Sequence, residues 1–108
     1  IFWRSMSTAL SHRQLKQMVR SLIDSDPQLK RNIKSVAIFG SYLHGEQHAD
    51  SDLDILVEFN ETPGLIEFIR IQHFFEDNLH IRVDLCTPEM LSKYFRDDVL
   101  NEAETVYG

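Results

Sequence analysis

Apolar side chains recur along this chain with the two periods that distinguish helices from strands. Positions three and four residues apart predict an amphipathic helix over about 11–23, which ends at or before Asp26 and Pro27. Alternation over 52–59 and again over 81–86 predicts two strands with one apolar face each. The nearly continuous apolar run over 35–39, stopped by Gly40, predicts a central strand covered on both faces.

Two further helices are predicted in the second half of the chain. A turn signal at 62–64 precedes an apolar-rich stretch over 65–75, which predicts a heavily buried helix. We interpret the aromatic cluster of this stretch as core rather than as a partner-facing patch: Phe68, Phe74 and Phe75. Pro88 suits a helix start, and a last helical stripe follows it: Met90, Leu91, Tyr94, Phe95 and Val99. The order of elements predicts a small α/β or α+β domain, a sheet of three or four strands covered by helices.

Length and composition limit the kind of protein further. With 108 residues, 43% hydrophobic and 26% charged, the chain has room for one hydrophobic core. We expect a single domain over 8–108 and an N-terminal extension over 1–7, of upstream or expression-derived sequence, since a Met stands at position 6. No apolar run approaches the roughly 20 residues that cross a bilayer, no signal-peptide pattern is present, and Cys86 has no cysteine to pair with, so we expect a cytoplasmic protein. The net charge of −6 disfavours binding of duplex DNA or RNA and allows a basic protein partner.

Three aspartates fall on the polar faces of the predicted strands. Asp52 and Asp54 are two residues apart, which places both carboxylates on one strand face, about 6.5 Å apart at the backbone. Asp84 has the same polar parity on the strand over 81–86, and it can meet the other two if the strands are neighbours. Carboxylate oxygens suit Mg²⁺ or Mn²⁺, and a pair of such ions can clamp the attacking and leaving oxygens of a phosphoryl-type displacement.

A glycine and a serine follow the buried strand that precedes these aspartates. Gly40 lets the backbone approach a phosphate closely, and the N–H groups around Ser41, with its hydroxyl, can donate to phosphate oxygens. A Gly-Ser turn alone is usually only a turn, and a lone Asp-x-Asp is more often a solvated edge. Their combination with a third aspartate of matching parity favours a divalent-metal nucleotidyl-transfer site.

These residues resemble a known signature. Gly40-Ser41, ten intervening residues and Asp52-Leu53-Asp54 match the G-S-x10-D-x-D motif of the polymerase-beta-like nucleotidyltransferase superfamily. Within it, the stretch over 39–57 is similar to the minimal nucleotidyltransferases, the antitoxins of the MNT or MntA type. The resemblance implies the fold of that superfamily, a small mixed sheet flanked by helices. It also implies that Asp52 and Asp54 hold two magnesium ions, that Asp84 completes one metal site and helps position or deprotonate the attacking hydroxyl, and that Gly40 and Ser41 hold the triphosphate of ATP.

The resemblance also implies a cellular role, that of the antitoxin in a type VII-like toxin–antitoxin pair. The antitoxin would bind a HEPN-domain ribonuclease toxin, transfer AMP from ATP to one of its tyrosines and so silence it. The chain departs from many relatives at His44, and from some at Tyr42, where they have arginine. A neutral histidine supplies less charge to a phosphate, which bears on triphosphate affinity or rate, while the catalytic aspartates are intact.

Three other interpretations stay open. The enzyme could transfer a nucleotide to a small molecule or to another protein, although a domain this short has little surface for a small-molecule pocket. An antitoxin could also neutralise its toxin by binding alone. His44, His48, Asp50 and Asp52 could suggest zinc, but their spacing matches no compact zinc pattern and solvated loop histidines are the simpler interpretation.

Overall fold

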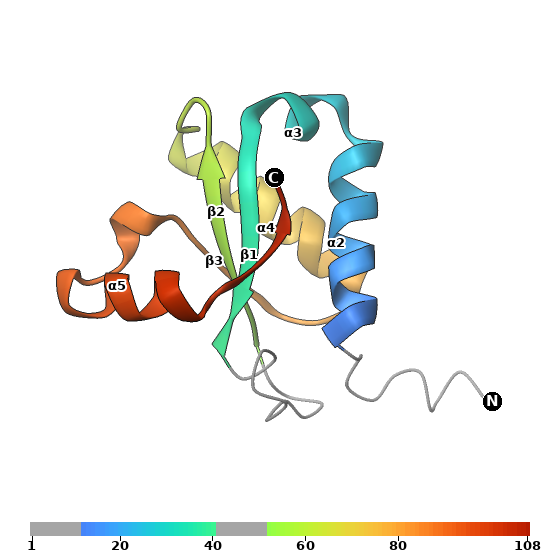
Figure 1. The fold of residues 1–108 in the computed structure, drawn as a ribbon. Helices are drawn as coiled ribbons and strands as arrows, with labels where there is room; N and C mark the ends of the chain where they lie inside the picture. The colour runs from blue at the N-terminus through green and yellow to red at the C-terminus, as the bar shows by residue number, and fades with distance from the viewer. Residues whose placement is uncertain (1–11, 41–51) are drawn as a thin grey trace.

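Helices cover a four-stranded sheet in the computed structural model, which describes residues 12–40 and 52–108 (Figure 1). The helices are α2 (His12–Ser25), α3 (Pro27–Asn32), α4 (Leu65–Leu79) and α5 (Lys93–Glu102), with a short 3₁₀ turn η2 (Pro88–Met90). The strands are β1 (Ile33–Phe39), β2 (Leu53–Phe59), β3 (Val83–Cys86) and β4 (Glu104–Tyr107).

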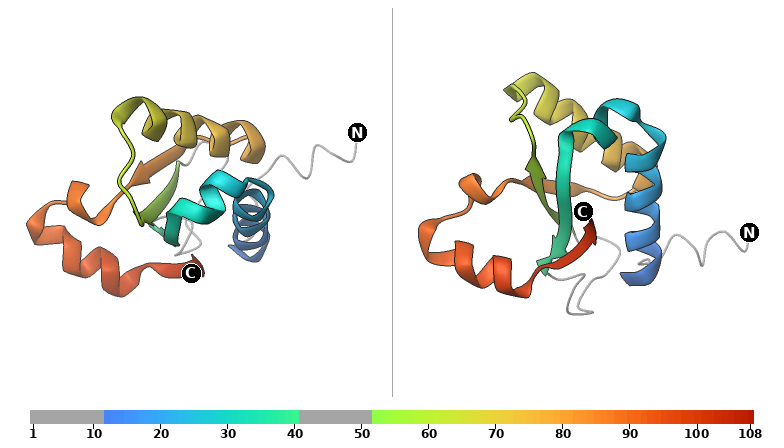
Figure 2. Two further views of the ribbon diagram at one scale, coloured as in Figure 1. Left: turned by 90° about the horizontal axis from the view of Figure 1, so that it is seen from above. Right: turned by 45° about the horizontal axis from the view of Figure 1, so that its top comes forward.

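The sheet is mixed and has the order β3-β2-β1-β4. β1 pairs antiparallel with both β2 and β4, whereas β2 and β3 run parallel, with α4 as the crossover between them. Figure 2 shows α4 on one side of the sheet and α5 on the other. The predicted α+β class and the small mixed sheet are therefore confirmed.

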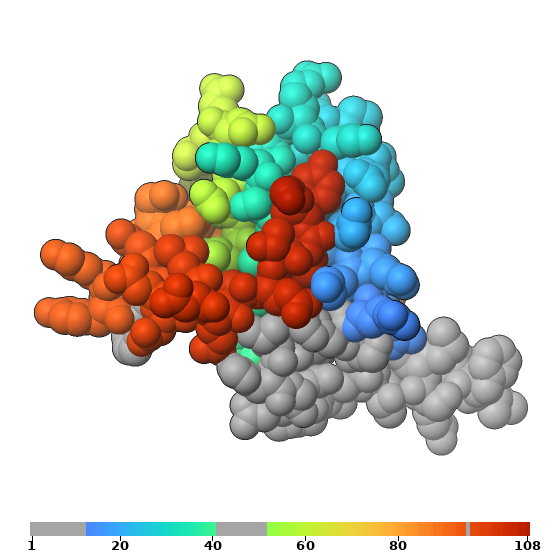
Figure 3. Space-filling view, viewed as in Figure 1, coloured from blue at the N-terminus to red at the C-terminus, as the bar shows by residue number. Residues whose placement is uncertain are grey.

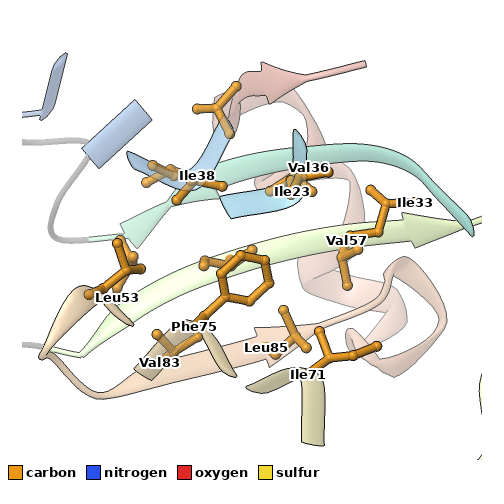
Figure 4. Packing of buried hydrophobic residues seen from close by; sticks show 14 of the residues in the cluster. Ile23, Ile33, Val36, Ile38, Leu53, Val57, Ile71, Phe75, Val83 and Leu85 are labelled. Atoms are coloured by element: carbon orange, nitrogen blue, oxygen red, sulfur yellow. The ribbon is translucent and has the colours of Figure 1, made fainter. Parts of the chain in front are cut away.

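The hydrophobic core lies between the sheet and helices α2 and α4. Each helix contributes residues four apart, as expected for one face of a helix, and the strands contribute alternate residues. Burial of each such side chain stabilises the fold by about 1.5–3 kcal/mol relative to leaving it in water. The helical positions are Leu15, Val19, Ile23, Ile71, Phe75 and Leu79, and the sheet positions include Val36, Ile38, Leu53, Ile55, Val57, Val83 and Leu85 (Figure 4).

The aromatic cluster of α4 is core, as predicted, but the helix as a whole is not heavily buried. Phe75 is fully buried, and Phe68 and Phe74 pack against the core at its edge. Leu65 and Ile66 are 74% and 79% exposed, which contradicts the expectation of a buried helix. The reason is geometric: only the face that carries Ile71, Phe75 and Leu79 meets the sheet.

The last predicted helix is interrupted. η2 ends at Met90, and α5 begins only after Ser92, whose hydroxyl accepts a hydrogen bond from the Tyr94 N–H at 3.2 Å. Met90 and Tyr94 are strongly exposed, so the predicted apolar stripe does not form one buried face. In the space-filling view, the segment from η2 into α5 projects from the rest of the molecule (Figure 3).

Two elements and one face differ from the sequence-based expectations. The pair Asp26-Pro27 starts a second helix, α3, because the Asp26 carboxylate accepts N–H bonds from Gln28 and Leu29. β4 was not expected, and it extends the sheet beside β1. Leu56 lies on the face of β2 predicted to be polar, yet it is 4% exposed, because it sits inside the sheet between neighbouring strands.

No helix within residues 12–40 and 52–108 is long and apolar enough to cross a membrane.

Candidate active site

The sheet places three of the predicted site residues side by side on adjacent strands. Phe39, the last residue of β1, is the register partner of Asp54 on β2, and Gly40 follows it directly. Asp54 is in turn the register partner of Asp84 on β3. Gly40, Asp54 and Asp84 therefore form a row across three strands at one end of the sheet.

Gly40 is required at its position for two independent reasons. Its φ is +82°, a left-handed conformation that residues with a Cβ rarely adopt. A Cβ built on Gly40 would also overlap the Asp54 carboxylate oxygen Oδ2. The sequence predicts a glycine here for close approach to a phosphate, and the structure adds close approach to Asp54.

Asp54 carries the electrostatic signature of a crowded acidic site. Its side chain is partly buried on β2, and its pKa is raised from 3.8 to about 6. Burial is the largest cause, followed by the negative charges of Asp84 and Asp52. A cation held among these carboxylates would relieve that repulsion.

Asp52 makes a different contact from the one predicted. Its Oδ1 lies 3.0 Å from Nε of Arg82, and both side chains are at least half exposed. Arg82 precedes β3, so this ion pair links the starts of the two parallel strands.

The three aspartates do not converge as closely as three metal ligands would. Within the described residues, no group of three or more His, Cys, Asp or Glu side chains is arranged to hold a metal ion. Asp54 and Asp84 nevertheless offer hard carboxylate oxygens from adjacent strands, a donor set that fits Mg²⁺. Asp52 would join them by exchanging its bond to Arg82, which costs little because exposed ion pairs contribute only about 0–1 kcal/mol.

Cys86 is a neighbour of the acidic row that the sequence analysis does not include in the site. It is half-buried on β3, with its Sγ 3.9 Å from Oδ1 of Asp84. Burial and then the charges of Asp84 and Asp54 raise the pKa of the thiol to about 11. The thiol therefore stays protonated at neutral pH and is a poor nucleophile. Cys86 is two residues from Asp84 on the same strand face, and this spacing is the sequence feature that could have predicted its position.

Several predicted site residues lie outside the described part of the chain. These are Ser41, predicted to bind the triphosphate, the two positions where relatives have arginine, Tyr42 and His44, and the remaining residues of the zinc alternative, His48 and Asp50.

Comparison with known proteins assigns the chain to one family. The family model described as "Polymerase beta, Nucleotidyltransferase" matches residues 23–108, which include Gly40, Asp52, Asp54 and Asp84. The chain belongs to this nucleotidyltransferase family. The match confirms the resemblance read from the G-S-x10-D-x-D motif and the enzyme class that it predicted.

Two curated relatives narrow the similarity within the family. The nucleotidyltransferase is 45% identical over 76 residues to MJ1215 of Methanocaldococcus jannaschii, which is provisionally named a protein adenylyltransferase; the match covers 68% of this chain and 85% of that protein. It is 41% identical over 70 residues to the protein adenylyltransferase MntA of Thermococcus cleftensis, covering 65% of this chain and 71% of MntA. The nucleotidyltransferase is thus similar to proteins named for the transfer of an adenylyl group to a protein.

A solved structure gives the same placement in three dimensions. A crystal structure of a toxin–antitoxin with AMP-PNP superimposes with a TM-score of 0.71 at 26% identity, covering 86% of this chain and 73% of that one. The nucleotidyltransferase therefore shares its fold with a chain of a toxin–antitoxin complex.

Proposed function

We propose that this nucleotidyltransferase is the antitoxin of a toxin–antitoxin pair, and that it transfers AMP from ATP to a tyrosine of a HEPN-domain ribonuclease toxin. The toxin would be neutralised by this modification. The observation that carries the proposal is the row of Gly40, Asp54 and Asp84 across three adjacent strands.

The relatives support the substrate class. MntA of Thermococcus cleftensis is named a protein adenylyltransferase, and the structural neighbour is a toxin–antitoxin with AMP-PNP. These similarities support ATP as the donor and a toxin as the acceptor protein, and the resemblance to the minimal nucleotidyltransferases supports a HEPN domain in the toxin.

The donor nucleotide would be held at the end of β1. Backbone N–H groups after Gly40, with the Ser41 hydroxyl, would donate to the triphosphate oxygens. Asp54 and Asp84, joined by Asp52, would hold two Mg²⁺ ions, with Mn²⁺ as a substitute; when bound, these ions would neutralise the phosphates and the charge that develops in displacement.

The acceptor would react at the side of the row where Asp84 stands. The tyrosine oxygen attacks the α-phosphorus, an oxygen–phosphorus bond forms, and the bond from the α-phosphorus to the bridging oxygen breaks, so that pyrophosphate leaves. Asp84 is exposed on the edge strand β3, where its carboxylate can position the hydroxyl and take its proton. Positioning of the two substrates would supply most of the rate enhancement.

The test is transfer of label from [α-³²P]ATP to a cognate HEPN-domain toxin, in the presence of Mg²⁺. We expect label on the toxin and loss of its ribonuclease activity. With Asp54→Asn, the toxin should acquire no label and keep its ribonuclease activity, while the complex stays intact on size-exclusion chromatography. A toxin that is neutralised without acquiring label would contradict the transferase proposal and would favour neutralisation by binding alone.

Transfer to a small molecule or to another protein is the alternative activity. It would be favoured if ATP were consumed in the presence of such an acceptor and the HEPN-domain toxin acquired no label.

A further inference from the structure

We infer that an apolar groove beside Asp84 is the docking site for the polypeptide segment that flanks the acceptor hydroxyl of the partner protein. This inference rests on the proposed function, since it identifies where the acceptor side of that reaction is recognised. The groove has a volume of about 710 Å³ and lies between the start of α4 and the turn η2. Asp84 is one of its lining residues, so the groove opens directly onto the acidic row.

The groove is lined mainly by apolar side chains. The rings of Phe59 and Phe68 form an edge-to-face pair with centroids 6.3 Å apart, and Leu85 of β3 is buried beside them. Leu65 of α4 and Met90 of η2 line the groove from different elements, and they are 74% and 60% exposed. Large apolar side chains left exposed around a concave surface mark a place where a partner binds.

The turn that presents Met90 is held by hydrogen bonds to its backbone carbonyls. The guanidinium of Arg96 donates to the carbonyl oxygens of Pro88 and Leu91, at 2.9 and 3.3 Å. The Met90 N–H donates to the Thr87 carbonyl at 3.0 Å. The groove is thus preorganised, which lowers the entropy cost of binding.

A strand added to the edge of the sheet is not the occupant that the groove suits. The edge N–H groups of Val83 and Leu85 already donate to side chains of α4, to Glu76 Oε2 at 3.0 Å and to Gln72 Oε1 at 3.3 Å. The partner segment would therefore bind through its side chains, with an apolar residue on the aromatic floor.

The charges around the groove favour a protein segment over a nucleotide. Among its lining residues, all in the described part of the chain, the charged ones are Asp84 and Glu89, and neither Lys nor Arg is present. An acidic rim repels phosphates and suits a neutral or basic polypeptide. Gly40, by contrast, lies on the far side of Asp54 from Asp84, so the predicted phosphate site and the groove occupy opposite ends of the row.

The chain offers a matched pair of variants to test this. Leu65 and Ile66 are adjacent residues of α4 with similar exposure, but only Leu65 lines the groove. The test would compare Leu65→Ser combined with Met90→Ser against Ile66→Ser, with a cognate HEPN-domain toxin as the acceptor. KM and kcat for the acceptor, its Kd by calorimetry, and the Kd for ATP are measured.

We expect the groove variant to raise the KM and the Kd for the acceptor by about tenfold. Its kcat at saturating acceptor and its Kd for ATP should stay within about twofold of wild type, and Ile66→Ser should change neither KM nor Kd. Equal effects of the two variants would overturn the inference. A weaker affinity for ATP with unchanged KM for the acceptor would also overturn it and would assign the groove to the nucleobase.

Failure of the proposed function has a different readout. Wild-type protein that transfers no label contradicts the proposed function, and the acceptor Kd then decides the inference. Weaker binding by the groove variant alone supports a docking groove in a binding-only antitoxin, and equal binding by all three proteins overturns the groove as well.

Discussion

Asp54 and Asp84 face each other as register partners in the parallel ladder of β2 and β3. Two like charges in this position destabilise the sheet that carries them, since directly opposed like charges in neighbouring strands repel. Arg82, two residues before Asp84 in the chain, forms an ion pair with Asp52 at 3.0 Å. The site therefore carries a cost in folding free energy that its chemistry would justify.

Asp54→Asn is expected to stabilise the fold near pH 7. Burial and the charges of Asp84 and Asp52 raise the pKa of Asp54 from 3.8 to about 6. Between these values the folded chain holds the proton and the unfolded chain releases it, so the free energy of unfolding falls as pH rises through this window, and the full cost is present above it. Because Asp54 is partly exposed and screened, we expect a gain of only about 1 kcal/mol.

Urea denaturation with a chelator present measures this gain at pH 7.5 and at pH 4. The control is Asp77→Asn, a change at an exposed aspartate of α4. The proposal of a crowded acidic site predicts a gain for Asp54→Asn at pH 7.5 that disappears at pH 4. The same gain at both pH values would show that charge is not its cause.

Mg²⁺ is expected to raise the thermal midpoint of the wild-type protein, because an ion that binds only the folded chain stabilises it. At a free concentration about ten times its Kd, the shift should be on the order of 5 °C. Differential scanning fluorimetry with and without Mg²⁺ measures it. Asp54→Asn with Asp84→Asn should remove the shift, and Asp77→Asn should keep it. A full shift in the double variant would place the ion elsewhere.

Gly40→Ala is expected to lower both stability and transfer activity. The substitution would place a Cβ against the Asp54 carboxylate and would strain a backbone at φ +82°. A left-handed conformation costs a residue with a Cβ about 1–2 kcal/mol, and displacement of Asp54 adds to this. The matched control is Gly64→Ala, since a Cβ there meets nothing within 4 Å. Equal losses of unfolding free energy in the two variants would contradict the assigned role of Gly40.

Strand parity placed Asp54 and Asp84 on the faces opposite the core, because the residues on either side of each aspartate are core residues, and the pairing of β2 with β3 brings the two side by side. The pairing of Asp52 was not accessible in the same way. It depends on the register between β2 and β3, which brings Arg82 beside Asp52, and the spacing of residues within one strand carries no information about that register.

The missed elements have local explanations. The pair Asp26-Pro27 is typical both of the end of a helix and of the start of the next one, as an N-cap followed by a first-turn proline. Both apply here. β4 spans four residues of which only Val106 is buried, so it offers too short an alternation to predict a strand. The groove could not be predicted either, since it joins residues from β2, α4, β3 and η2.

Arg82→Gln is expected to change the response to Mg²⁺ more than the stability of the fold. The ion pair with Asp52 is exposed, so its loss should cost at most about 1 kcal/mol. Removal of the guanidinium frees Asp52 and takes a positive charge away from the proposed metal site. The Mg²⁺ concentration for half-maximal transfer should therefore fall, most clearly at low ionic strength. Arg70→Gln, which removes an exposed arginine paired with Glu67 on α4, is the control. A rise in the Mg²⁺ requirement would mean that Arg82 serves the reaction itself.

Glu76→Ala is expected to weaken the edge strand that carries Asp84. Glu76 Oε2 accepts the Val83 N–H at 3.0 Å, and its side chain is 23% exposed, so the variant leaves a partly buried donor unpaired at the sheet edge. Loss of such a hydrogen bond to a charged acceptor costs about 1.5–3 kcal/mol. Glu67→Ala, on the same helix, removes only a more exposed ion pair with Arg70 and should cost less than about 1 kcal/mol. Urea denaturation gives both costs, and amide exchange at Val83 and Leu85 locates the effect. Faster exchange at Val83 in Glu76→Ala alone is the expected result, because this N–H then has no acceptor on α4, while Gln72 still accepts the Leu85 N–H. Unchanged exchange at Val83 would show that the bond to Glu76 does not hold the edge of β3.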